Sequence, residues 1–114
     1  MNDWREQEVR NEARSRDRNE WIEAIRGEMG GEVVTGVYVC ECGDGACVEP
    51  IRLTRPEYEA VRGYPTRFVI AVDHENPEID QVVSEGRRYA VVQKIAGRPA
   101  RIARQTSIRH GGAV

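Results

Sequence analysis

Three cysteines within eight residues constrain this chain more than any other feature. Cys40, Cys42 and Cys47 stand in the segment CECGDGAC, and the 114-residue sequence contains no further cysteine. Residues two apart in an extended strand point to the same side, so Cys40 and Cys42 can direct both sulfurs toward one point. Gly43 and Gly45 permit the backbone conformations that turn the chain back and bring Cys47 to the same point. We call residues 40–47 the cysteine knuckle.

The chemistry of the cysteine knuckle favours a metal ion over a disulfide. Three cysteines leave one thiol over after any pairing, and a reducing cytosol disfavours disulfides. Three thiolates and one imidazole are the donors that tetrahedral zinc prefers. Free thiols on a turn, with an ordinary loop histidine, are the main alternative, and a redox role is a second one.

The fourth donor could be His74, His110, Asp44 or a neighbouring carboxylate. We favour His74, because it is expected at the end of a strand and just before a capped helix, where a side chain is held firmly. His110 lies in the C-terminal tail. The predicted ligands of a Zn²⁺ ion are therefore Cys40, Cys42, Cys47 and His74.

The length of the chain fits one small domain. A structural zinc, which contributes about 10 to 16 kcal/mol in small peptides, would compensate for a small core. No segment approaches the roughly 20 apolar residues of a membrane span, and the N-terminal segment has no apolar core of a signal peptide. We therefore expect a cytoplasmic protein without a membrane segment.

Helical and extended patterns alternate along the chain and predict an α+β domain. A long helix is expected from Asp3 to about Glu28, with a solvated, charged first half and an apolar face containing Val9, Ala13, Trp21 and Ile25. The further predicted elements are strands over 32–42 (with a bulge or kink at Gly36), 48–53, 66–72 and 88–95, and helices over 54–61 and 76–84. The 32–42 and 48–53 strands form a hairpin that carries the zinc knuckle, and the 54–61 helix begins with a capping box at Thr54 and Glu57. The predicted organisation is a helical arm (1–30), a zinc-binding α+β domain with a small antiparallel sheet (31–96) and a basic tail (97–114).

The charges are distributed unevenly. Residues 1–85 hold all 19 acidic residues against 10 arginines, whereas residues 86–114 hold seven basic residues and no acidic one. The tail could fold back onto the acidic parts of its own chain or of a second copy, as in a homodimer. Alternatively, it could neutralise the phosphates of a nucleic acid through Arg98, Arg101, Arg104 and Arg109.

The predicted function is that of a protein-interaction or regulatory module with a structural zinc. Trp4 and Trp21 on the helical arm are candidate anchors for a protein partner, because tryptophan is enriched at interfaces. Catalysis would require an open zinc position and a base, for which Glu41, Asp44 and Glu75 are the nearby carboxylates. With His74 as a ligand the coordination shell is closed, so we expect no enzyme. Nucleic-acid binding in transcription is the first alternative and a metal-dependent hydrolase the second.

Several segments also resemble a family of short uncharacterised proteins common in actinobacteria. The resemblance covers residues 5–109 and is carried by the cysteine knuckle, by the LTRPEYE segment at 53–59, by the His-Glu pair at 74–75 and by YAVVQK at 89–94. In that family the three cysteines and the histidine recur together. The resemblance therefore implies that Cys40, Cys42, Cys47 and His74 belong to one site. Asp73 departs from the family pattern, which usually has glycine before the histidine.

Overall fold

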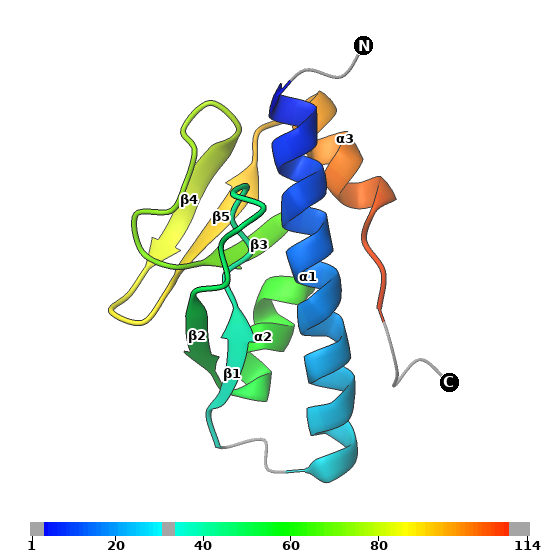
Figure 1. The fold of residues 1–114 in the computed structure, drawn as a ribbon, viewed down its shortest axis with the longest axis vertical. Helices are drawn as coiled ribbons and strands as arrows, with labels where there is room; N and C mark the ends of the chain where they lie inside the picture. The colour runs from blue at the N-terminus through cyan, green and yellow to red at the C-terminus, as the bar shows by residue number, and fades with distance from the viewer. Residues whose placement is uncertain (1–3, 31–33, 110–114) are drawn as a thin grey trace.

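The longest element of the structure is α1 (Trp4–Met29), a 26-residue helix that runs along one side of the molecule (Figure 1). The computed structural model describes residues 4–30 and 34–109, so the predicted helix start at Asp3 lies outside the described part. The prediction that the first half is solvated is wrong, because Glu6, Glu12 and Arg16 are buried there.

The apolar face predicted for α1 is only partly present. Val9 and Ala13 are buried, but Trp21 and Ile25 are 55% and 56% exposed. The buried side of this helix is polar toward its C-terminal half, where it presents Asn19, Glu20 and Glu23 to the rest of the protein. Burial of so many ionisable groups requires partners, which are supplied by other elements of the fold.

The cysteine knuckle lies in the predicted hairpin. Strand β1 (Gly36–Val39) pairs with β2 (Pro50–Leu53) in an antiparallel register that is regular at Gly36, so the predicted bulge is wrong. Gly36 instead lies against Arg26, whose guanidinium carbon would be 2.6 Å from a Cβ atom at that position. The predicted strand residues Glu32 and Val33 lie outside the described residues.

Helix α2 (Arg55–Arg62) follows with the predicted capping box. The Thr54 hydroxyl accepts from the Glu57 backbone N–H at 3.2 Å, and the Glu57 carboxylate accepts from the Thr54 N–H at 2.8 Å. Tyr58 on the inner face is fully buried, and the helix ends before Gly63. This local motif satisfies its own backbone groups, which explains why it could be predicted.

The remaining strands form a second antiparallel sheet with the order β3-β5-β4. They are β3 (Arg67–Ile70), β4 (Asp80–Glu85) and β5 (Ala90–Lys94). The helix predicted over residues 76–84 is wrong: the backbone N–H groups of Ile79 and Asp80 donate to the carbonyl of Asn76, but the chain then extends as β4. The β-branched pair Val82 and Val83 and the ladder with β5 override the helical start signal.

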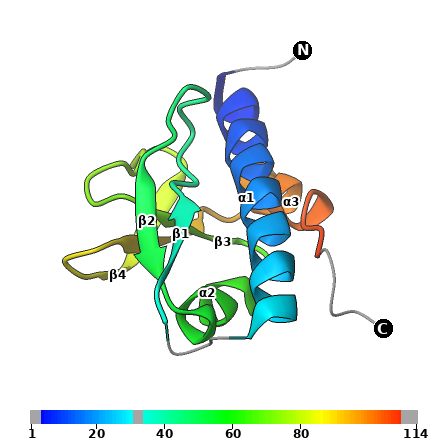
Figure 2. The same ribbon diagram turned by 60° about the horizontal axis from the view of Figure 1, so that its bottom comes forward.

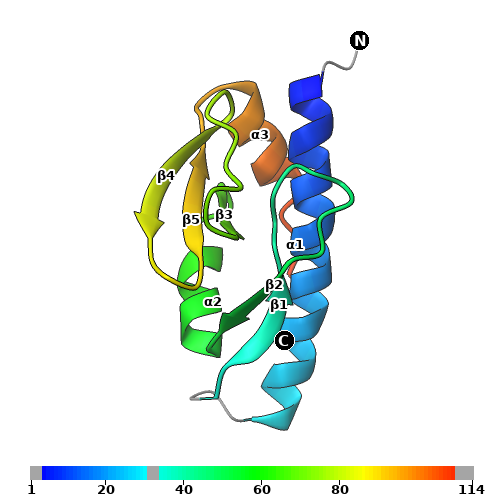
Figure 3. The same cartoon turned by 60° about the vertical axis from the view of Figure 1, so that its left-hand side comes forward.

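Helix α3 (Arg98–Gln105) completes the fold and packs along α1 (Figure 1). Ile102 of α3 and Val9 of α1 belong to the same core cluster as Tyr38 and Phe68. Both sheets lie on one side of α1 (Figures 2 and 3). The predicted α+β class is therefore confirmed, with two small antiparallel sheets and with α3 as the second short helix.

The basic C-terminal segment contacts acidic side chains of its own chain. Arg98 pairs with Glu6 at 2.8 Å, and Arg109 pairs with Glu59 at 2.6 Å and also with Glu20. Folding back of the tail is thus observed at these two arginines. In the part of the chain that the structure describes, no helix combines the length and apolarity needed to cross a membrane.

Candidate metal centre

Cys40 stands directly after β1 and is held by hydrogen bonds on two sides. Its backbone N–H donates to the Glu49 carbonyl at 2.8 Å, and its Sγ accepts from the Ala71 N–H at 3.2 Å. The residue is fully buried. Through these hydrogen bonds, Cys40 connects the hairpin to the end of β3 even without a metal ion.

Glu41 fixes the extended segment between the first two cysteines. Its backbone N–H donates to the Val69 carbonyl at 2.8 Å, and its carboxylate accepts from the Val69 N–H at 3.0 Å and from the Asn19 side chain at 2.8 Å. Burial raises the pKa of this carboxyl to about 7. Glu41 is thus a buried link between α1, the cysteine knuckle and β3, and not a solvated carboxylate or an accessible base. Its role was missed because its partners are remote in sequence.

The return turn of the knuckle is built by Asp44. Its carbonyl accepts from the Cys47 N–H at 3.0 Å, and its carboxylate accepts from the Ala46 N–H at 2.9 Å. The Asn11 side chain of α1 donates to the Gly43 carbonyl at 3.0 Å. Asp44 therefore forms its hydrogen bonds within its own turn, and the turn directs the Cys47 side chain back toward Cys40.

His74 is presented by a tight turn after β3. Its backbone N–H donates to the Ala71 carbonyl at 3.1 Å, and Asp73 has a φ of 71°, which lies in the left-handed region. A positive φ at the third position is typical of a type II turn, where glycine is preferred. The predicted strand-to-helix junction is therefore a strand-to-turn junction, followed by a loop and β4.

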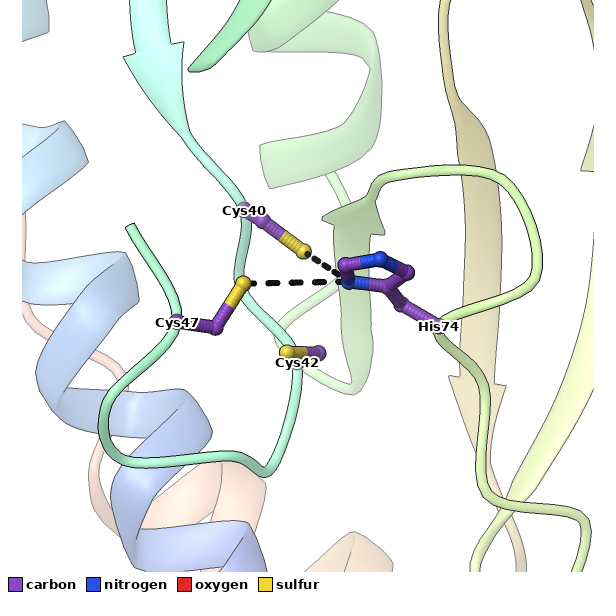
Figure 4. A group of neighbouring side chains, drawn as sticks. All are labelled: Cys40, Cys42, Cys47 and His74. Atoms are coloured by element: carbon purple, nitrogen blue, oxygen red, sulfur yellow. Dashed lines mark hydrogen bonds between the residues drawn. The ribbon is translucent and has the colours of Figure 1, made fainter. Parts of the chain in front are cut away.

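The four predicted ligand side chains converge on one point (Figure 4). Their donor atoms all lie within 4.8 Å of one another, an arrangement that could hold a metal ion. The His74 Nδ1 atom is 3.5 Å from Cys40 Sγ and 3.7 Å from Cys47 Sγ. Tetrahedral zinc with bonds of about 2.3 Å to sulfur and about 2.0 Å to nitrogen requires a sulfur-to-nitrogen separation of about 3.5 Å. The observed distances agree with this geometry.

The three cysteine thiols differ in their pKa. The hydrogen bond from the Cys40 thiol lowers the pKa of Cys42 to about 5, and the same bond raises the pKa of Cys40. Burial raises the pKa of Cys47. A thiolate is the form that binds a metal, so Cys42 is ready to act as the first ligand. A cation at the centre would displace the protons on the other two sulfurs.

The centre is accessible from one side. Cys40 and Cys42 are buried, Cys47 is partly exposed and His74 is exposed. A cleft of about 480 Å³ opens next to the cluster, and its walls include Glu8, Cys42, Asp44, His74, Glu75 and Asn76. The Glu75 Oε1 atom has no hydrogen-bond partner among the described residues. The cleft brings solvent to the centre and surrounds the approach with carboxylates.

The comparison with the other candidate ligands concerns the described part of the chain. His110 lies outside the described residues. Within the described part of the chain, the four-residue cluster is the one group of three or more cysteine, histidine or carboxylate donors arranged closely enough for a metal. No family model, no curated protein and no solved structure matches the chain. The resemblance to the actinobacterial family therefore stays a prediction, and the geometry of the site carries the functional conclusions.

Proposed function

We propose that the protein is a small zinc-binding module in which the ion has a structural role. The observation that carries this proposal is the convergence of three cysteine sulfurs and the His74 Nδ1 atom within 4.8 Å. The cysteines come from the β1–β2 hairpin and the histidine from the turn after β3, so one ion would connect the two sheets.

The donor set supports zinc over other metals. Thiolates and imidazole are soft or borderline ligands, whereas calcium and magnesium require oxygen ligands. Iron–sulfur clusters are usually held by four cysteines, and this chain contains three. A redox-inert ion with tetrahedral coordination fits both the number and the spacing of the donors.

The closed donor set supports a structural role over a catalytic one. Catalytic zinc sites usually have three protein ligands and one water, whereas structural sites have four protein ligands. Of the three carboxylates considered as a base, Glu41 is buried, Asp44 accepts a hydrogen bond within its own turn, and Glu75 alone lines the cleft without such a bond to its Oε1 atom among the described residues. A metal-dependent hydrolase therefore has less support than a structural centre.

Metal analysis and chelation test this proposal directly. Purified full-length protein should contain one zinc per chain by elemental mass spectrometry. Because a structural zinc contributes about 10 to 16 kcal/mol, its removal by excess chelator should abolish the cooperative thermal transition. Cys47→Ser should behave like the chelated protein, while Ala46→Ser, an exposed neighbour in the same turn, serves as the matched control. Unchanged melting after complete zinc removal would refute the structural role.

An exposed apolar stripe supports binding of a protein partner. Trp21, Ile25 and Met29 recur every four residues on α1, and they are 55%, 56% and 80% exposed. Residues at this spacing lie on one face of a helix. We propose that this stripe contacts another protein or a second copy of the chain. Sedimentation of wild-type protein and of Trp21→Ala over a range of concentrations would detect self-association that depends on the stripe.

Nucleic-acid binding through the tail is the less supported alternative. Arg98 and Arg109 already pair with carboxylates of the same chain, which leaves the exposed Arg101 and Arg104 of α3 to contact phosphates. Phosphate binding would give an affinity that falls steeply with salt concentration. A titration with duplex and single-stranded oligonucleotides at two salt concentrations, with Arg101→Ala and Arg104→Ala combined as the variant, would test it.

A further inference from the structure

We propose that Cys47 is an oxidation site at which a hydroperoxide opens the zinc centre by forming a Cys42–Cys47 disulfide. This inference rests on the proposed zinc site. It starts from the unequal exposure of the three sulfur ligands: Cys40 is fully buried, Cys42 is 4% exposed and Cys47 is partly exposed. Oxidation depends on thiolate character and on exposure. All three sulfurs are thiolates when they bind zinc, so exposure makes Cys47 the sulfur that a small oxidant reaches first.

Cys42 lies close enough to react with an oxidised Cys47, and a short glycine-containing turn joins the two residues. The donor atoms of both residues belong to the cluster that spans 4.8 Å. The intervening residues 43–46 include Gly43 and Gly45, which give this turn freedom to adjust as the sulfurs approach bonding distance. Cys42 also borders the open cleft, through which the displaced ion can leave.

Cys40 is held back from this reaction by its surroundings. Its sulfur accepts the Ala71 N–H at 3.2 Å, and its backbone N–H donates to the Glu49 carbonyl at 2.8 Å. Moving Cys40 out of this position would leave the partly buried Ala71 N–H without its acceptor, which costs free energy. The structure therefore assigns the disulfide to the two sulfurs on the turn side of the cluster.

The chemical step is a two-electron oxidation of the protein. The Cys47 thiolate attacks one oxygen of hydrogen peroxide, the O–O bond breaks, and Cys47 becomes a sulfenic acid as hydroxide leaves. The Cys42 thiolate then attacks the Cys47 sulfur, the S–S bond forms, and a second hydroxide leaves. The two hydroxides take up two protons from solvent to give water. One peroxide is reduced, and two thiolates are oxidised.

Zinc release is the consequence of this step. The disulfide removes two of the four ligands, and Cys40 with His74 alone cannot hold the ion in a closed tetrahedral shell. The ion leaves, and the connection between the two sheets that it supplied is lost. Reduction by a dithiol returns both thiolates, so the centre can be filled again.

The experiment uses zinc-loaded full-length protein treated with hydrogen peroxide. A chromogenic chelator reports zinc release, and mass spectrometry of the non-reduced proteolytic digest identifies the disulfide. We expect release of the ion together with a Cys42–Cys47 crosslink, followed by reuptake of zinc after dithiothreitol. A Cys40–Cys47 or Cys40–Cys42 crosslink would overturn the assignment. Zinc that stays bound after prolonged treatment with excess hydrogen peroxide would overturn it as well.

A ligand exchange separates this inference from the zinc proposal. Cys47→His preserves four donors but removes the exposed thiolate, so peroxide should release zinc at least about tenfold more slowly than from wild type. If the variant does not hold zinc, the crosslink map of the wild-type protein still decides the assignment. Wild-type protein that contains no zinc before oxidation would refute the zinc proposal itself. Wild-type protein that contains zinc but forms no disulfide would refute the oxidation site alone.

Discussion

A buried triad of charges should make the stability of this protein depend on pH in an unusual direction. The Lys94 ammonium of β5 contacts the carboxylates of Glu12 on α1 and Asp80 on β4, and all three side chains are buried. Burial raises the pKa of Glu12 to about 8, Lys94 opposes this rise, and Asp80 and Glu8 reinforce it. One ammonium thus faces two carboxylates, and Glu12 is the carboxylate that retains a proton.

The direction of the effect follows from proton linkage. A carboxyl whose pKa is higher in the folded state binds a proton that the unfolded chain has released. The free energy of unfolding therefore falls as the pH rises between the unfolded value of 4.5 and the folded value of about 8. The slope is at most about 1.4 kcal/mol per pH unit, so three units from pH 5 to pH 8 cost at most about 4 kcal/mol. Above pH 8 the contribution levels off.

Glu12→Gln tests this reasoning because glutamine has nearly the same shape and does not titrate. Its amide oxygen can still accept from Lys94. Urea unfolding followed by circular dichroism, with zinc saturating at every pH, should give a variant that gains stability relative to wild type as the pH rises. Zinc binding itself strengthens with pH as thiols deprotonate, and taking the difference between the two proteins removes that contribution. Glu28→Gln, at an exposed site on the same helix, is the control. Parallel pH curves for wild type and Glu12→Gln would refute the reasoning.

Three further substitutions have defined outcomes. Gly36→Ala places a Cβ atom 2.6 Å from the Arg26 guanidinium carbon and should cost about 1 to 3 kcal/mol in urea unfolding, whereas Gly45→Ala, with its nearest contact at 3.4 Å, should cost less. Arg62→Met removes the partner that lies 2.7 Å from buried Glu20 and should cost about 3 to 5 kcal/mol, and a melting temperature equal to wild type would contradict this. Asp73→Val puts a β-branched residue at a φ of 71° and should cost about 1 to 3 kcal/mol while weakening zinc affinity through His74. Asp73→Gly should retain wild-type affinity in a competition titration with a zinc chelator.

The parts of the fold that were predicted correctly are those determined by local chemistry. The cysteine knuckle is a hairpin end with glycines at the turn, and the Thr54 capping box satisfies its own backbone groups within four residues. Donor chemistry leaves several candidates for the fourth ligand, and the place of His74 at the end of a strand favours it, although the helix expected after it is a turn and a loop. The glycine that the resembling family usually has at this position is typical of the left-handed conformation that Asp73 adopts, but aspartate itself gives no such signal.

The errors arose where distant partners decide the structure. Residues 76–84 begin with helical signals, but the ladder between β4 and β5 determines their conformation. The polar face of α1 has the pattern of a solvated face, because the partners of its buried charges are far away in sequence. Glu12, for example, meets Lys94 across 82 residues. A sequence pattern records which side chains are polar, and it does not record which of them find an opposite charge after folding.

The uneven charge distribution acquires a structural explanation from these contacts. The acidic side chains of α1 face inward at Glu6, Glu12 and Glu20, and each meets a basic side chain from the last quarter of the chain. The Lys94–Glu12 pair is buried on both sides and is screened little by salt, whereas Arg98 and Arg109 reach buried carboxylates from partly exposed positions. Three of the seven basic residues after position 85 therefore contact acidic side chains of α1 within the fold. Only basic side chains that remain at the surface, such as Arg101 and Arg104, are left for an external partner.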